Sequence, residues 1–165
     1  MKEKTLLLLL YCLPGILFSC TGSREEHQLL ESIEQIWQQS ETDLSEANVR
    51  AEKLRDSVRV SSEYVRQKYN LLTIRLRDKK NIIPSSPDSA IQTLSYFANR
   101  KNAIDKERAY YYMGSAYRDL KDYPRAVSHF LNAIDVAKQS RHTDTPYLAE
   151  LPIATDIPLP DAAEL

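Results

Sequence analysis

A single glycine in the middle of a helical pattern is the feature that most constrains this 165-residue chain. Gly114 lies in the window 107–140, where apolar residues recur three, four and seven positions apart, the spacing of an amphipathic helix. A glycine inside a helix costs roughly 1 kcal/mol relative to alanine. We therefore expect a neighbouring helix to pass so close to Gly114 that no Cβ fits there.

The same window divides into two helices joined by a tight turn. Apolar residues at helical spacing occupy one face before the turn, from Tyr110 to Leu120, and resume after it, from Tyr123 to Ala137. Asp122 is the predicted N-cap of the second helix. Pro124 is tolerated in the first turn because the N–H that it lacks has no helical partner. The window therefore predicts an antiparallel helical hairpin.

The order of residue types in this hairpin resembles a tetratricopeptide repeat, whose pattern is W-x2-L-G-x2-Y…A-x3-F. The matching repeat-core positions are Tyr110, Met113, Gly114, Tyr117, Ala126, Phe130 and Ala133. The resemblance implies an all-α fold in which antiparallel hairpins stack as a short α-solenoid. It also implies a concave groove lined by the first helix of each repeat, whose positions here are Arg108, Tyr111, Ser115, Arg118 and Asp119.

Upstream residues predict further helices, because residues 24–80 contain no glycine or proline. We expect helices over about 25–39, from the N-cap Asp43 onward, and over about 62–78. A break near Asp56-Ser57 separates the second helix from the third; without it, the two would form one long rod. Ser86 and Pro87 then predict the N-cap and first residue of a fourth helix.

An earlier, degenerate copy of the repeat is predicted over residues 62–97. Ala90, Leu94 and Phe97 recur at the spacing of Ala126, Phe130 and Ala133. Tyr69, Leu72, Thr73 and Leu76 take the places of Tyr110, Met113, Gly114 and Tyr117, provided that a loop of about five residues is inserted between the two helices. A still weaker copy runs from Ile33 to Leu54.

The first residues predict a signal peptide. Lys2 and Lys4 precede an apolar run over 6–18, which at 13 residues is shorter than the roughly 20 needed to span a bilayer. The run ends at Leu17-Phe18-Ser19-Cys20, which resembles the lipobox of bacterial lipoproteins. The resemblance implies a signal peptide over 1–19, a lipid on Cys20 and attachment to the bacterial cell envelope, facing the periplasm or the surface.

Sorting and domain limits follow from the same resemblance. Thr21 is not the aspartate that retains such proteins at the inner membrane, so the outer membrane is favoured. Residues 20–26 are the expected linker and 27–140 the expected helical array. The tail, 141–165, contains four prolines, which exclude a long helix. Either this tail covers the outer side of the last helix, or the chain is a truncated or frame-shifted version of a longer protein.

Nothing in the sequence predicts catalysis, a metal site or a cofactor. His27, His129 and His142 share no metal-ligand spacing, and His129 reads as a surface or packing residue. The acidic side chains are expected at solvent positions. Tyr110 is assigned to the core, whereas Tyr111 and Tyr112 point elsewhere because successive helical residues lie 100° apart. The net charge of −1 and the lack of a recognition motif argue against nucleic-acid binding.

The leading functional hypothesis is a membrane-anchored scaffold that binds an envelope protein or peptide. One alternative is a glycan-binding or nutrient-binding outer-membrane lipoprotein that stacks sugars on exposed tyrosines. Another is a truncated sensor or regulatory protein built on the same repeat.

Overall fold

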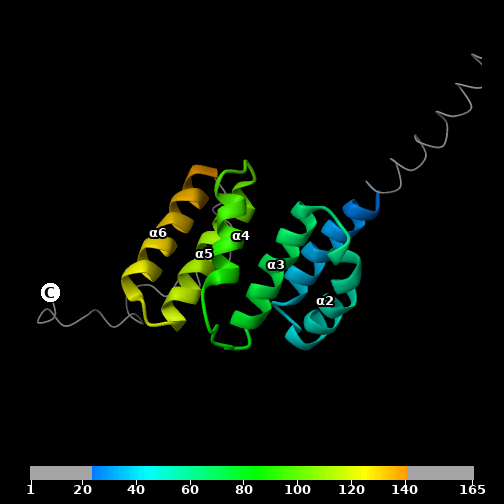
Figure 1. The fold of residues 1–165 in the computed structure, drawn as a ribbon, viewed down its shortest axis with the longest axis horizontal. Helices are drawn as coiled ribbons and strands as arrows, with labels where there is room; N and C mark the ends of the chain where they lie inside the picture. The colour runs from blue at the N-terminus through cyan, green and yellow to red at the C-terminus, as the bar shows by residue number, and fades with distance from the viewer. Residues whose placement is uncertain (1–23, 141–165) are drawn as a thin grey trace, which may run out of the picture. The chain divides into compact units, whose positions relative to one another are not determined.

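The computed structural model describes residues 24–140, which form helices and contain no strand within that range (Figure 1). A helix over 24–39 is followed by α2 (Leu44–Arg59), α3 (Glu63–Asp78), α4 (Asp88–Ala98), α5 (Ala103–Asp119) and α6 (Tyr123–Ser140). The expected all-α class is therefore confirmed. The predicted signal peptide, Cys20 and the tail over 141–165 lie outside the described residues.

The chain divides into two compact units, Met1–Arg66 and Gln67–Leu165. In the first unit, the helix over 24–39 and α2 bury Ile33, Ile36, Trp37, Ala47, Ala51 and Val58. Asp43 is the N-cap of α2 as predicted, since its side chain accepts a hydrogen bond from the Glu46 N–H at 2.9 Å. Residues 24–26, expected in the linker, already belong to the first helix.

The break between α2 and α3 falls at residues 60–62, four residues later than the predicted position. The Ser62 N–H at the start of α3 donates to the Glu26 carboxylate at 2.7 Å. A glutamate distant in sequence therefore satisfies a donor that a local cap would otherwise serve. The two helices are separate, and the long-rod alternative is wrong.

In the second unit, two loops of unequal length connect helices. Nine residues, 79–87, separate α3 from α4, whereas three, 120–122, separate α5 from α6. We call the first of these the long loop; its excess of six residues is close to the insertion expected from the sequence. Pro87 is the N-cap of α4 rather than its first residue, and the Ser86 hydroxyl contacts the Asp88 N–H at 3.4 Å.

The short turn matches its prediction closely. Lys121 adopts a positive φ of 62°, and the Asp122 carboxylate accepts a hydrogen bond from the Arg125 N–H at 3.3 Å. Pro124 lies in the first turn of α6. The positive φ lets the chain reverse within three residues, so α6 packs directly against α5.

Gly114 lies against an aromatic ring of α6. A Cβ placed on Gly114 would lie 2.7 Å from two ring carbons of Phe130, a distance that forces something to move. The predicted close approach is therefore confirmed, and the neighbouring group is a buried side chain rather than helix backbone. On its other side, α5 packs against α4, where Ala90, Met113 and Ala116 form a cluster with Ile74, Leu94 and Tyr117.

The burial of α5 corrects two sequence expectations. Tyr111 and Tyr112 are buried while Tyr110 is only partly buried, the reverse of the predicted order. Asp105 and Glu107 are also buried, although acidic residues were expected in solvent. The reason is that α5 has neighbours on several sides, so its burial extends beyond a single apolar stripe.

Candidate functional site

Three side-chain contacts join α3 to α5 at one constant separation in sequence. Lys68 pairs with Asp105 at 2.6 Å, Arg75 donates to the Tyr112 hydroxyl at 2.8 Å, and the Ser115 hydroxyl donates to Asp78. Each pair is 37 residues apart. The difference between the two residue numbers stays constant only if the two helices run in the same direction. In antiparallel helices, one residue number would rise as the other falls, so their sum would stay constant instead.

The contact between Lys68 and Asp105 is a buried ion pair. The Lys68 side chain is 11% exposed and the Asp105 side chain 1%. Charges removed from water in this way are tolerated only when each has a partner. This pair therefore fixes the relative register of α3 and α5 at the start of α5.

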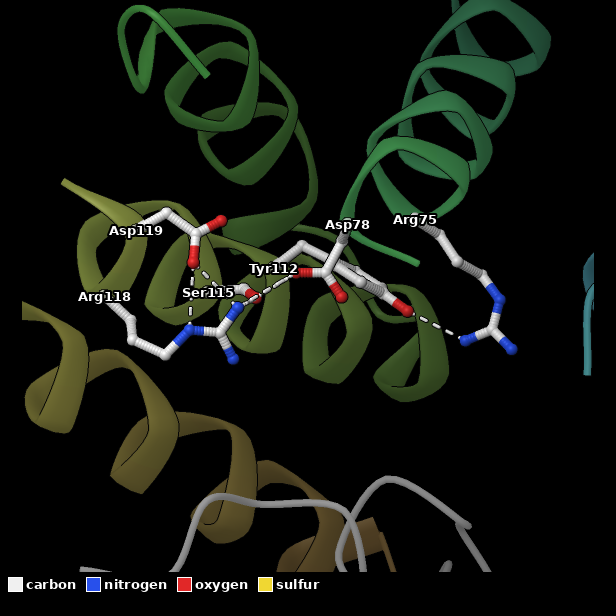
Figure 2. Close-up of polar contacts among 6 residues, drawn as sticks. All are labelled: Arg75, Asp78, Tyr112, Ser115, Arg118 and Asp119. Atoms are coloured by element: carbon white, nitrogen blue, oxygen red, sulfur yellow. Dashed lines mark hydrogen bonds and ion pairs between the residues drawn. The ribbon is translucent and has the colours of Figure 1, made fainter. Parts of the chain in front are cut away.

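At the other end of the same two helices, four residues form a polar cluster that we call the Arg118 cluster: Asp78, Ser115, Arg118 and Asp119 (Figure 2). The Arg118 guanidinium donates to Ser115 at 2.9 Å, to Asp78 at 3.3 Å and to Asp119 at 2.8 Å. Burial lowers the pKa of Arg118, but the hydrogen bond and charges of Asp119 and Asp78 outweigh it and raise that pKa above its usual value.

A pocket opens beside the Arg118 cluster, between α3, α4, α5 and the long loop. The space in it that the centre of a water-sized sphere can occupy is about 40 Å³. Its lining combines carboxylates, hydroxyls and an arginine with apolar side chains: Ile74, Arg77, Asp78, Ile82, Pro84, Ser86, Ser89, Ala90, Tyr112, Ser115, Ala116 and Asp119. The small side chains of Ala90 and Ala116 leave the space that larger residues would fill.

The predicted groove residues are only partly brought together. Ser115 and Asp119 line the pocket, and Arg118 links them. Arg108 is 7% exposed, and Tyr111 packs 5.6 Å from the Phe130 ring, centroid to centroid. Neither of these two lines the pocket, so three of the five predicted positions belong to one site and the other two belong to the interior of α5.

His129 has a packing role on the other side of α5. Its ring stacks on Tyr117 at 5.4 Å between centroids and on Tyr110 at 6.2 Å. Burial lowers the pKa of His129 below its usual value. The imidazole therefore favours its neutral form in the folded state.

Three parts of the pocket were not among the site residues expected from the sequence: Asp78, Tyr112 and the long loop. Asp78 and Asp119 are the last residues of α3 and α5, and both bind the same guanidinium. An acid at corresponding helix ends, 41 residues apart, is a pattern that the repeat alignment contained. This pair of aspartates is the signal in the sequence that indicates the site.

The glycan-binding alternative depends on exposed tyrosines. Within 24–140 every tyrosine is buried or partly buried. Five of them, Tyr64, Tyr96, Tyr110, Tyr117 and Tyr123, are partly exposed, and that alternative stays a prediction.

Two kinds of site are absent from the described helices. Within residues 24–140, no helix is long and apolar enough to cross a membrane, and no group of three or more His, Cys, Asp or Glu side chains could hold a metal ion. No protein-family model, curated protein or solved structure matches the chain.

Proposed function

We propose that this chain is a short tetratricopeptide-like scaffold of the bacterial envelope that binds a segment of another protein and catalyses no reaction. A lipid on Cys20 anchors it, with the outer membrane favoured. The segment binds in the pocket between α3, α4 and α5. The single observation that carries this proposal is the parallel register of α3 and α5.

Parallel first helices are what stacked hairpin repeats produce. In such arrays each repeat contacts its neighbours, so the first helices of successive repeats lie side by side and form a continuous concave surface. The contacts of α3 with α5 have this direction. The contacting residues of α3 and α5 are 37 positions apart in the sequence. Equivalent positions of the two predicted repeats, such as Tyr69 and Tyr110, are 41 apart, so each α3 residue contacts α5 about one helical turn before its equivalent position.

The lining of the pocket supports a polypeptide as the ligand. Extended segments need hydrogen-bond partners for their backbone and small recesses for their side chains. The hydrogen-bond partners are the hydroxyls of Ser86 and Ser89 and the pocket carboxylates. The recess for a side chain is the space beside Ala90 and Ala116.

A site-specific crosslinking experiment tests the proposal. A photo-reactive amino acid replaces Ser89, an exposed residue of the pocket, or the exposed Ser128 of α6 as the matched control. We expect an adduct with one envelope protein from position 89 and none from position 128. The identified partner, once purified, should bind the Ser89→Trp variant more weakly than the Ser128→Trp variant. Equal binding to both would refute a ligand in this pocket.

The anchor requires a separate test, because Cys20 lies outside the described residues. Cells fed radioactive palmitate should label the unaltered chain and leave the Cys20→Ala variant unlabelled. Labelling of both proteins, or of neither, would exclude a lipid on Cys20.

A further inference from the structure

The tip of the long loop exposes two adjacent isoleucines, of which only Ile82 belongs to the pocket. Ile82 is 51% exposed and Ile83 is 68% exposed. Ile82 forms part of the rim of the pocket, whereas Ile83 is absent from its lining. Burying a large aliphatic side chain is favourable, so a second surface that covers Ile83 would gain stability from the contact.

Three cations precede the two isoleucines in the chain, and one exposed acid, Asp88, follows the loop. The long loop contains Lys79 and Lys80 and no acidic residue, and the exposed Arg77 lies just before it. Of the two acids that flank the loop, Asp78 accepts hydrogen bonds from Ser115 and Arg118, and Asp88 accepts one from Ser86. The tip therefore combines apolar side chains with cations.

We propose that the tip of the long loop docks into the surface of an anionic phospholipid bilayer. The isoleucines enter the boundary between headgroups and acyl chains, and the neighbouring cations contact lipid phosphates. Apolar burial combined with attraction to anionic lipid is what holds peripheral proteins at a membrane surface. This inference goes beyond the proposed function, since it concerns a residue outside the pocket and needs no protein partner.

A second exposed aliphatic residue provides the comparison. Leu131 on α6 is 55% exposed, an exposure close to that of the isoleucines. Asp135 lies one helical turn further along α6, and the four residues on either side of Leu131 contain no lysine or arginine, whereas Lys79 and Lys80 lie within four residues of Ile83. Anionic lipid should therefore accept Ile83 and leave Leu131 in water.

Quenching of tryptophan fluorescence by brominated lipid tests the docking at a single residue. The full chain, with either Ile83→Trp or Leu131→Trp, is reconstituted into vesicles of brominated phosphatidylcholine and phosphatidylglycerol. The native Trp37 is 2% exposed and supplies a background common to both variants. We expect a loss of fluorescence in Ile83→Trp relative to Leu131→Trp. Equal quenching in the two variants, or none in Ile83→Trp, would overturn the proposal.

Because both variants retain the same N-terminus, a lipid on Cys20 cannot by itself produce a difference between them. Replacing Lys80 by glutamine in the Ile83→Trp background should weaken docking about fivefold, because each cation near an anionic surface contributes about 1 kcal/mol. Vesicles without phosphatidylglycerol should likewise reduce the quenching. If added polyglutamate, but not brominated lipid, changes the emission of the new tryptophan, the tip binds acidic protein and the membrane proposal is wrong.

Discussion

The helix pairs α3–α4 and α5–α6 have the same order of elements but different connections. A three-residue turn connects α5 to α6, and the Phe130 ring of α6 packs directly against Gly114 of α5. A nine-residue loop connects α3 to α4, and a pocket lies beside Ala90 and Ala116. We infer that the tight pair contributes stability and that the open pair supplies binding surface, because loops tolerate exposed and irregular residues that packed helices do not.

The largest expected effect concerns the Lys68–Asp105 ion pair, which links α3 of one helix pair to α5 of the other. Lys68→Met leaves the buried Asp105 carboxylate without this partner and should lower the free energy of unfolding by about 3–5 kcal/mol. Urea titration measures the change. The double variant Lys68→Met/Asp105→Leu should recover much of the loss because no unpaired charge remains. A single variant as stable as the parent would show that the register does not depend on this pair.

The next effect tests the tight pair at its closest contact. Gly114→Leu should cost about 2–3 kcal/mol of unfolding free energy, because the added atoms collide with Phe130. Gly114→Ala should also destabilise the parent. In a Phe130→Leu background, the same change should become stabilising by roughly 1 kcal/mol, since alanine favours helix over glycine. An identical effect of Gly114→Ala in both backgrounds would contradict the proposed contact.

The starts of α6 and α4 should respond unequally to loss of their capping side chains. Asp122→Ala should cost about 1 kcal/mol, because the Asp122 carboxylate satisfies the Arg125 N–H. Ser86→Ala should cost less, since Pro87 is the N-cap of α4 and makes no side-chain capping bond. Thermal unfolding followed by circular dichroism compares the two variants. A larger loss for Ser86→Ala would reverse our ranking of the two pairs.

The smallest effect is a dependence on pH. The pKa of His129 is lowered in the folded chain, so the unfolded chain binds a proton first as the pH falls. Stability should therefore decrease below about pH 6.5, the ordinary histidine value, and the decrease should end below the folded pKa. Urea midpoints at pH 7.5 and 5.5 should differ less in His129→Gln than in the parent. His27→Gln, at an exposed histidine, should retain the parent's difference.

Local signals in the sequence were sufficient to predict most of the fold. Helix class, the caps at Asp43 and Asp122, and the close approach at Gly114 all depend on residues near one another in the chain. The end of α2 was predicted too early, whereas α3 begins near the predicted residue 62, where the Ser62 N–H donates to Glu26, a partner 36 residues away. Sequence spacing carries no information about such a partner until the helices are placed.

The candidate site was harder to predict for the same reason. The groove positions on α5 came from the repeat resemblance, and Ser115, Arg118 and Asp119 do meet in one cluster. Their partner Asp78 is on α3, and the pocket depends on the conformation of the long loop. The burial order of Tyr110, Tyr111 and Tyr112 was reversed because single-helix periodicity assumes one buried face, whereas α5 has several.

The enclosure of α5 limits how this chain could be divided. Of the ten residues from Glu107 to Ala116, nine are buried. A terminal helix of an array would instead leave one side exposed to solvent. Separating the chain between residues 102 and 103 would remove the α3 partners of Asp105, Tyr112 and Ser115 at once, so neither fragment should be an autonomous module.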